Sequence, residues 1–155
     1  MTTTLEKQTA NLGVAWENLY GYTQAVKVKD TIYISGQLSH DKAGNLVAPA
    51  AVDETGKPRD FGNMAAQMQQ TYRNAVELLA QFGATLDNVV EETLYVLDVD
   101  AAFQVAGQVR KEVYGSAQPA VASNLIGVSR LAFPEQLIEI TFRAVVDEQA
   151  PRAVP

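Results

Sequence analysis

The longest periodic segment of the chain is DFGNMAAQMQQTYRNAVELLAQFG, residues 60–83. Its apolar side chains recur every three or four residues, as they do along one face of an α-helix. These residues are Met64, Met68, Tyr72, Ala75, Val76, Leu79 and Phe82. Asp60 is a suitable N-cap, and Gly83 stands where a left-handed residue would end the helix. The pattern therefore predicts a helix whose Met and aromatic side chains belong to the core.

Strand patterns flank this helix on both sides. Before it, Tyr22–Lys29 and Thr31–Gly36 are rich in β-branched and aromatic residues, and Lys29-Asp30 predicts a tight hairpin between them. After it, we expect a strand at Asn88–Asp98, a helix at Ala101–Tyr114, and strands at Ala120–Leu131 and Gln136–Val146. The order β-β-α-β-α-β-β predicts an α+β fold, with a mixed sheet and two helices packed on one face. Oligomerisation would then cover the other face.

Length and composition narrow the class of protein. The 155 residues fit a single domain over 1–155, with 1–8 and 147–155 as frayed tails. The chain has no Cys and one His, which excludes disulfides, thiolate chemistry and zinc held by several His or Cys ligands. Its net charge of −6 argues against nucleic acid and anionic membranes as partners. We expect no metal site, because these ligands are missing. We expect a cytoplasmic protein, because the N-terminus carries no secretory signal.

Two arrangements of polar residues offer little chemistry. His40 lies beside Ser39 and Asp41, but neighbours in one turn rarely meet as a nucleophile, base and acid, so we expect a solvated turn histidine. Glu91 and Glu92 point to opposite faces of a strand and do not form an acid/base pair.

The last strand is more informative. One of its faces is apolar, with Ile138, Ile140, Phe142 and Ala144, and the other carries Leu137, Glu139, Thr141 and Arg143. A carboxylate in mid-strand costs desolvation unless it is hydrated or paired. Two interpretations stay open: a Glu139–Arg143 pair on a solvated face, or a carboxylate placed in a cleft to manage a proton or a water.

Seven short motifs occur in a fixed order along the chain. They are Gly21-Tyr22-Thr23-Gln24-Ala25, Ile34-Ser35-Gly36-Gln37-Leu38, Asp41…Gly44, the segment 81–90, Tyr95-Val96-Leu97-Asp98, Val128-Ser129-Arg130-Leu131 and Ile138-Glu139-Ile140. In this order they resemble the RidA (YjgF) family of enamine/imine deaminases, and the resemblance covers about Tyr20 to Val146.

The resemblance implies a fold like chorismate mutase of the bacterial trimeric type. It implies a homotrimer, with a small-molecule substrate or ligand bound in clefts between subunits and with no cofactor. Family sites combine a tyrosine, a Ser-Gly pair, an arginine that grips the substrate carboxylate and a glutamate that positions water. Tyr22, Ser35, Gly36 and Glu139 match four of these positions.

The arginine has no counterpart. Its place falls on Ser123 or Val121, and no Lys or Arg occurs from Ser116 to Ser129. Ser123 and Asn124 are therefore the candidate substrate-binding residues there. A neutral hydrogen bond is roughly half as strong as the charge-assisted contact that a guanidinium makes. The asparagine that some members carry on the second helix falls near Gly107.

Three hypotheses follow. The first is a cofactor-independent hydrolytic deaminase that releases ammonia from reactive enamines or imines. Its substrate preference would be altered by the missing arginine. A specialised version of this hypothesis is an enzyme like 2-aminomuconate deaminase. Glu139 would be its general base and then its acid, and Tyr22 would make polar contact with the substrate. The second is a non-catalytic trimer that binds a small molecule. The third is a structural or chaperone-like oligomer.

Overall fold

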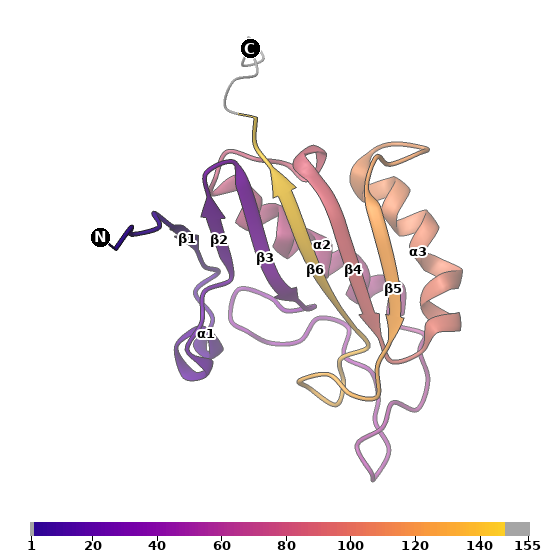
Figure 1. Cartoon of the computed structure of the whole chain (residues 1–155). Coiled ribbons are helices and arrows are strands. Elements are labelled where there is room, and N and C mark those ends of the chain that lie inside the picture. The colour runs from indigo at the N-terminus through magenta and orange to yellow at the C-terminus, as the bar shows by residue number, and fades with distance from the viewer. Residues whose placement is uncertain (1, 148–155) are drawn as a thin grey trace.

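Six strands form one mixed sheet in the order β1-β2-β3-β6-β4-β5, with two long helices on one face (Figure 1). The structure is a computed structural model and describes residues 2–147. Its elements are β1 (Gln8–Ala10), α1 (Ala15–Tyr20), β2 (Ala25–Val28), β3 (Thr31–Gln37), α2 (Met64–Ala80), a 3-10 turn (Leu86–Asn88), β4 (Val89–Val96), α3 (Val99–Tyr114), β5 (Ala122–Gly127) and β6 (Ile138–Val145). Strands β4 and β5 are parallel, and the other neighbours are antiparallel.

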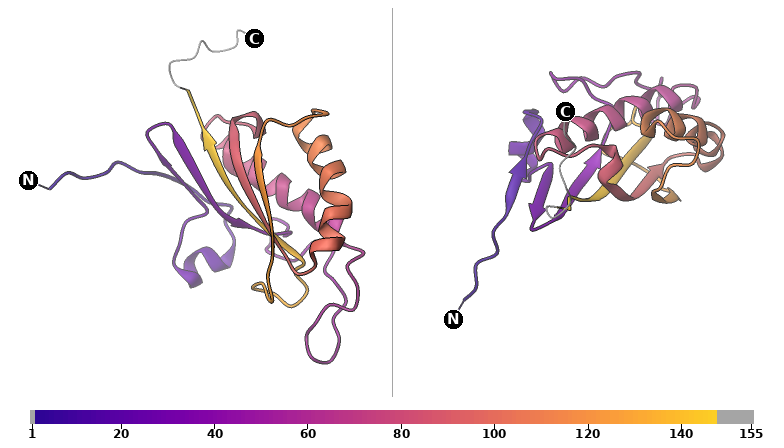
Figure 2. Two further views of the ribbon diagram at one scale, coloured as in Figure 1. Left: turned by 45° about the vertical axis from the view of Figure 1, so that its right-hand side comes forward. Right: turned by 90° about the horizontal axis from the view of Figure 1, so that it is seen from above.

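The apolar stripe of α2 explains the layer of helices. Met64, Met68, Tyr72 and Leu79 are each at most 1% exposed, and α2 packs on β3 and β6. Helix α3 buries only small side chains and Val109, and it packs mainly against α2. Both helices lie on the same side of the sheet (Figure 2). The predicted α+β fold is therefore confirmed.

Turn residues fix where the elements begin and end. Lys29 and Asp30 join β2 to β3 with Lys29 at φ 53°, which confirms the predicted hairpin. Gly115 ends α3 at φ 65°, and Gly83 adopts φ 71° just after α2. The expected start of α2 at Asp60 was wrong, because Asp60 Oδ1 accepts the Gly62 N–H at 2.8 Å in a preceding turn.

Other differences concern the ends of the chain and one helix position. Strand β1 and helix α1 precede the first predicted strand, so Gln8 belongs to the sheet rather than to a frayed tail. Val76, expected in the core, is 41% exposed. The predicted C-terminal tail, Asp147–Pro155, lies outside the described residues from position 148 onward.

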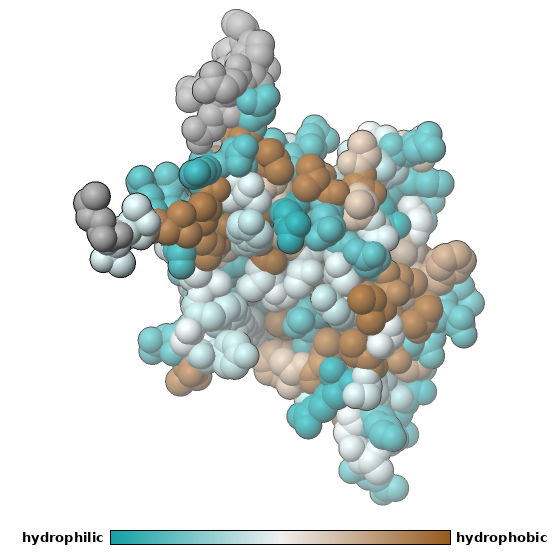
Figure 3. All heavy atoms as spheres, in the orientation of Figure 1, coloured by the Kyte–Doolittle hydropathy of each residue, from teal (hydrophilic) through white to brown (hydrophobic). Residues whose placement is uncertain are grey.

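The face of the sheet opposite the helices has no cover within the described chain. Tyr33 is 48% and Ile126 is 44% exposed there. Figure 3 views this face, where weakly polar side chains fill the middle and apolar ones gather over β4 and β5. No helix within residues 2–147 has the length and apolar character needed to cross a bilayer.

Candidate functional site

Strand β6 places Glu139 on the open face of the sheet. Its neighbours Ile138 and Ile140 are fully buried against the helices, so the alternation of the strand turns Glu139 the other way. Glu139 is half-buried and pairs in register with Tyr95 of β4. Arg143 does not serve as its partner, because the Arg143 guanidinium lies over the Tyr33 ring, 5.5 Å from the centroid.

Gly36 makes room for the Glu139 carboxyl group. The pairing of β3 with β6 is irregular between Ile34 and Gln37, and this irregularity brings the Gly36 backbone close to Glu139. A Cβ atom at position 36 would lie nearer to the Glu139 carboxyl than real Cβ contacts allow. Only glycine therefore permits this position of the carboxyl group.

The Glu139 carboxyl group faces a cavity of about 480 Å³. The cavity is lined by Trp16, Tyr20, Tyr22, Ser35, Gly36, Leu38, Ala132, Phe133 and Glu139. We call this the Glu139 pocket. Its volume is within the usual range for small-molecule sites, about 300–1,000 Å³. Among these lining residues Glu139 is the only acid, and none is Lys, Arg or His.

Aromatic rings form much of the wall of the Glu139 pocket. Trp16 and Phe133 meet edge to face with centroids 5.7 Å apart, and Tyr20 and Tyr22 do so at 5.3 Å. Trp16 and Tyr20 come from α1, a helix that the sequence pattern did not predict. Gly21 allows the chain to leave α1 with φ 83°, which returns Tyr22 toward the pocket.

Side chains on β3 and just before β2 orient the Ser35 hydroxyl. Ser35 Oγ donates to Gln24 Oε1 at 3.2 Å, and Gln37 Nε2 donates to the same oxygen at 2.9 Å. Both glutamines are buried. Because the Ser35 proton is directed at Gln24, its oxygen remains able to accept a hydrogen bond from a molecule in the pocket.

The pocket shifts the titration of two groups. Burial raises the pKa of Glu139, and the Gln136 amide partly opposes this shift. Burial also raises the pKa of Tyr22, so its hydroxyl stays protonated and able to donate at neutral pH. A carboxyl group with a raised pKa holds a proton more readily than an ordinary carboxyl, which suits it to accept a proton and later return it.

The structure brings four of the six predicted site residues together. Tyr22, Ser35, Gly36 and Glu139 all line the pocket. Ser123 and Asn124 lie on β5, away from that pocket within the chain. Asn124 is on the open face, where its Nδ2 donates to Thr93 Oγ1 at 3.3 Å. Ser123 is on the helix side of the sheet.

Ser123 contacts a buried carboxylate that the sequence analysis did not single out. Glu92 is fully buried, and its oxygens accept from Ser123 Oγ at 3.0 Å, Tyr72 Oη at 2.7 Å and Tyr114 Oη at 3.1 Å. Arg110 Nε pairs with Glu92 at 2.5 Å, and Arg110 Nη2 donates to Ser123 at 3.0 Å. Burial, with the Glu92 charge added, raises the pKa of both tyrosines.

The sequence does hold a signal for this network. Glu92 lies on the same face of β4 as Leu94 and Val96, which are fully buried. A carboxylate buried on that face needs a positively charged partner. Arg110 and Tyr114 stand four residues apart on α3, so one face of the helix presents both. The prediction that Glu91 and Glu92 point to opposite faces of the strand is confirmed, because Glu91 pairs in register with Arg143 and Glu92 with Phe142.

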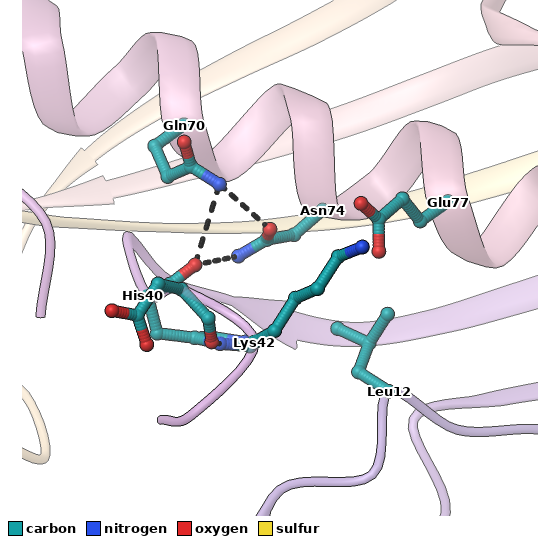
Figure 4. Close-up of a pocket in the computed structure, with 7 residues that line it drawn as sticks. Leu12, His40, Lys42, Gln70, Asn74 and Glu77 are labelled. Carbon is teal, nitrogen blue, oxygen red and sulfur yellow. Dashed lines mark hydrogen bonds between the residues drawn. The ribbon is translucent and has the colours of Figure 1, made fainter. Parts of the chain in front are cut away.

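His40 is buried, not solvated as expected. It is 3% exposed, its Nδ1 lies 2.8 Å from Asp41 O, and its ring meets Trp16 at 5.0 Å. Amide groups of Gln70 and Asn74 on α2 donate to the His40 carbonyl oxygen (Figure 4). These contacts fix the turn after β3 and support the Trp16 side of the Glu139 pocket.

Known proteins resemble this chain in sequence and in fold. The family model described as Endoribonuclease L-PSP matches residues 13–146. The 2-iminobutanoate/2-iminopropanoate deaminase of Bos taurus is 34% identical over 102 residues, which are 66% of this chain and 65% of that protein. The match thus spans just under two thirds of the length of that relative. The human protein of the same name is 33% identical over 103 residues, with the same coverage of 66% and 65%.

A solved structure from Mycobacterium tuberculosis has a similar fold. It is a member of the YjgF/YER057c/UK114 family, with a TM-score of 0.69 and 25% identity. The match covers 91% of this chain and 100% of that one.

Proposed function

The chain belongs to the Endoribonuclease L-PSP family, the family of YjgF and RidA, and on that premise we propose that it is a hydrolytic deaminase of imines and enamines. The observation that carries the proposal is the Glu139 carboxyl group, half-buried with a raised pKa beside the hydroxyls of Tyr22 and Ser35. The family description also names a ribonuclease. The net charge of −6 and the pocket without a basic residue do not favour an RNA substrate.

In the proposed reaction, water adds to the carbon of a protonated imine. The Glu139 carboxylate takes one proton from the attacking water as the C–O bond forms, which gives a neutral amino alcohol. Glu139 then gives that proton to the amino nitrogen. The C–N bond breaks and ammonia leaves, while the hydroxyl group gives its proton to the Glu139 carboxylate and becomes a carbonyl; Glu139 then passes that proton to solvent. Tyr22 donates to the oxygen, and Ser35 Oγ accepts from the imine N–H.

Ammonia release tests the proposal. Imines are generated in the assay, from amino acids by an amino acid oxidase and from primary amines by an amine oxidase. We expect the purified chain to release ammonia faster than buffer or heat-denatured protein does, for at least one of the two imine classes. Equal rates throughout would contradict the proposal. Ligand binding without turnover would then favour the hypothesis of a non-catalytic binding trimer.

The oligomeric state is a separate prediction. One face of the sheet lies open, with Tyr33 and Ile126 nearly half exposed, so we expect a homotrimer that covers this face. Light scattering after size exclusion is expected to give about three times the chain mass of 16.8 kDa at micromolar concentration. A mass of one chain across that range would contradict the prediction.

Gly36→Ala is expected to lower the deaminase rate by about 10²-fold without unfolding the protein. The added Cβ displaces the end of the flexible Glu139 side chain, so the carboxyl moves while the backbone keeps its place. Gly107→Ala is the matched control, since a Cβ there meets nothing within 4 Å, and helix propensity favours Ala by about 1 kcal/mol. The account would be contradicted if Gly36→Ala kept full activity.

A further inference from the structure

Two buried glutamines lie behind the Glu139 pocket. Gln24 is 2% and Gln37 is 1% exposed within one chain, so a neighbouring subunit can add groups to the pocket without reaching either side chain. We propose that Gln24 and Gln37 set the hydrogen-bonding polarity of the pocket, so that Tyr22 presents a donor and Ser35 an acceptor to the bound molecule. This inference rests on the proposed function and adds two positioning residues to it.

A backbone carbonyl fixes the direction of these hydrogen bonds. Gln37 Nε2 donates to Ser35 O at 3.0 Å and to Gln24 Oε1 at 2.9 Å. A carbonyl oxygen can only accept, so the Gln37 amide nitrogen must face it, and the reversed amide would bring two oxygens together. The same nitrogen then needs an oxygen as its second acceptor, and Gln24 Oε1 supplies it. The Ser35 carbonyl thus determines how both amide groups are oriented.

The Gln37 amide also supports an irregularity in β3. The pairing of β3 with β6 shifts between Ile34 and Gln37. Ser35 and Gly36 lie in this bulge, where the ladder of backbone hydrogen bonds is interrupted. Because Gln37 bonds the carbonyl inside the bulge, it helps to hold the backbone that places Gly36 beside the Glu139 carboxyl group.

Gln24 passes its orientation on to two hydroxyl groups. Its Oε1 accepts from Ser35 Oγ at 3.2 Å, which leaves the Ser35 oxygen as an acceptor toward the pocket. Burial raises the pKa of Tyr22, and hydrogen bonds from the Trp16 indole and the Gln24 side chain oppose this rise. A hydrogen bond that lowers the pKa of a phenol is donated to its oxygen. The Tyr22 proton is therefore left for a molecule in the pocket that Tyr22 lines.

This polarity fits the proposed reaction. Tyr22 donates to the oxygen that becomes a carbonyl, and Ser35 accepts from the imine N–H. With the hydroxyls free to rotate, each could present the wrong end of its dipole. Hydrogen bonds directed in advance need no reorganisation when charge develops in the transition state.

NMR of the side-chain amide groups tests the inference without any turnover. In nitrogen-labelled protein, we expect the amide protons of Gln24 and Gln37 to exchange with water far more slowly than those of Gln104, which is exposed on α3. Tyr22→Phe removes one acceptor, so it is expected to speed exchange at Gln24 by about 5-fold or more and to leave Gln37 unchanged. Exchange at Gln24 that does not respond to Tyr22→Phe would overturn the inference.

A kinetic cycle tests whether Gln24 acts through the hydroxyls. Gln24→Met is expected to lower kcat for imine hydrolysis at least about 10-fold, because both hydroxyls lose their orientation. In the double variant Tyr22→Phe/Ser35→Ala, the same substitution is expected to cost less than about 2-fold, since no hydroxyl is left to orient. A role in stability alone would lower the rate equally in both backgrounds. Gln104→Met is the matched control and is expected to change neither rate.

Gln24→Glu covers the case in which Gln24→Met does not fold. Its carboxylate keeps an acceptor for Ser35 and Gln37 but has no donor for Tyr22. We expect it to lower the plateau of the pH–rate profile as far as Tyr22→Phe does, and to add nothing when the two are combined. The plateau is compared because a second carboxylate nearby shifts the acidic limb.

The two readouts separate this inference from the proposed function. Absence of ammonia release by the wild type would overturn the deaminase, while amide exchange would still decide the polarity of the pocket. Ammonia release by the wild type, with an equal loss from Gln24→Met in both backgrounds, would overturn the inference alone.

Discussion

Replacement of Arg110 by Met is expected to lower the free energy of unfolding by about 3–5 kcal/mol. The substitution leaves the Glu92 carboxylate fully buried with only the hydroxyls of Tyr72, Tyr114 and Ser123 as partners. Hydroxyl groups satisfy its hydrogen bonds but do not neutralise its charge. For a chain of this size, each kcal/mol corresponds to about 2–4 °C in Tm.

Chemical denaturation at one fixed protein concentration measures this loss. Arg73→Met is the matched control. Arg73 is exposed on α2, and within residues 2–147 its side chain donates a hydrogen bond to Gln70 alone, so a change within about 0.5 kcal/mol is expected. Adding Glu92→Gln to Arg110→Met removes the unpaired charge and is expected to restore part of the stability. If Arg110→Met had the same free energy of unfolding as the wild type, the claim that Arg110 neutralises the buried Glu92 charge would be contradicted.

The sequence predicted the elements whose signals are periodic. The spacing along 60–82 located α2, and the alternation along Ile138–Val145 placed Glu139 opposite the buried row. Helix α1 has six residues, too few for a periodic signal, so Trp16 and Tyr20 were missed as pocket residues. Phe133 lies beside Pro134 between β5 and β6, where no periodic pattern marks it as a pocket residue.

The position of Ser123 could not be read from its own strand. Residues 122–127 are exposed or half-buried, so their pattern does not tell which face meets the helices. The parallel register with β4, which pairs Ser123 with Glu92, decides the face. The register between two strands distant in sequence is set by which of their faces is buried in the folded protein, and one strand alone does not reveal it. The burial of His40 also depends on residues distant in sequence, because Trp16 of α1 contacts its ring and Gln70 and Asn74 of α2 bond its carbonyl oxygen. The expectation of a solvated histidine was therefore wrong.

Glu139→Gln is expected to reduce ammonia release by at least about 10²-fold while the protein stays folded. The amide neither takes a proton from water nor returns one to the leaving nitrogen. In the wild type, activity is expected to fall as pH falls through the Glu139 pKa, which burial raises above the ordinary value. The acidic limb of the pH–rate profile is therefore expected at a higher pH than an exposed Glu would give.

The same raised pKa predicts a pH-dependent stability difference. Because the folded state favours protonated Glu139, the wild type loses stability as pH rises from the ordinary Glu pKa, about 4.3, through the raised folded value. The Gln variant has no such loss. Its Tm is expected to exceed that of the wild type at neutral pH, with the difference disappearing in acid.

The rate constant for imine hydrolysis, measured against protein concentration for the wild type and for Glu139→Gln, tests the central claim most directly. The account predicts a rate that rises linearly with wild-type protein and stays at the buffer value with the variant. Both proteins must show the same oligomeric mass and a cooperative unfolding transition. Equal acceleration by the two proteins would contradict a catalytic role for Glu139.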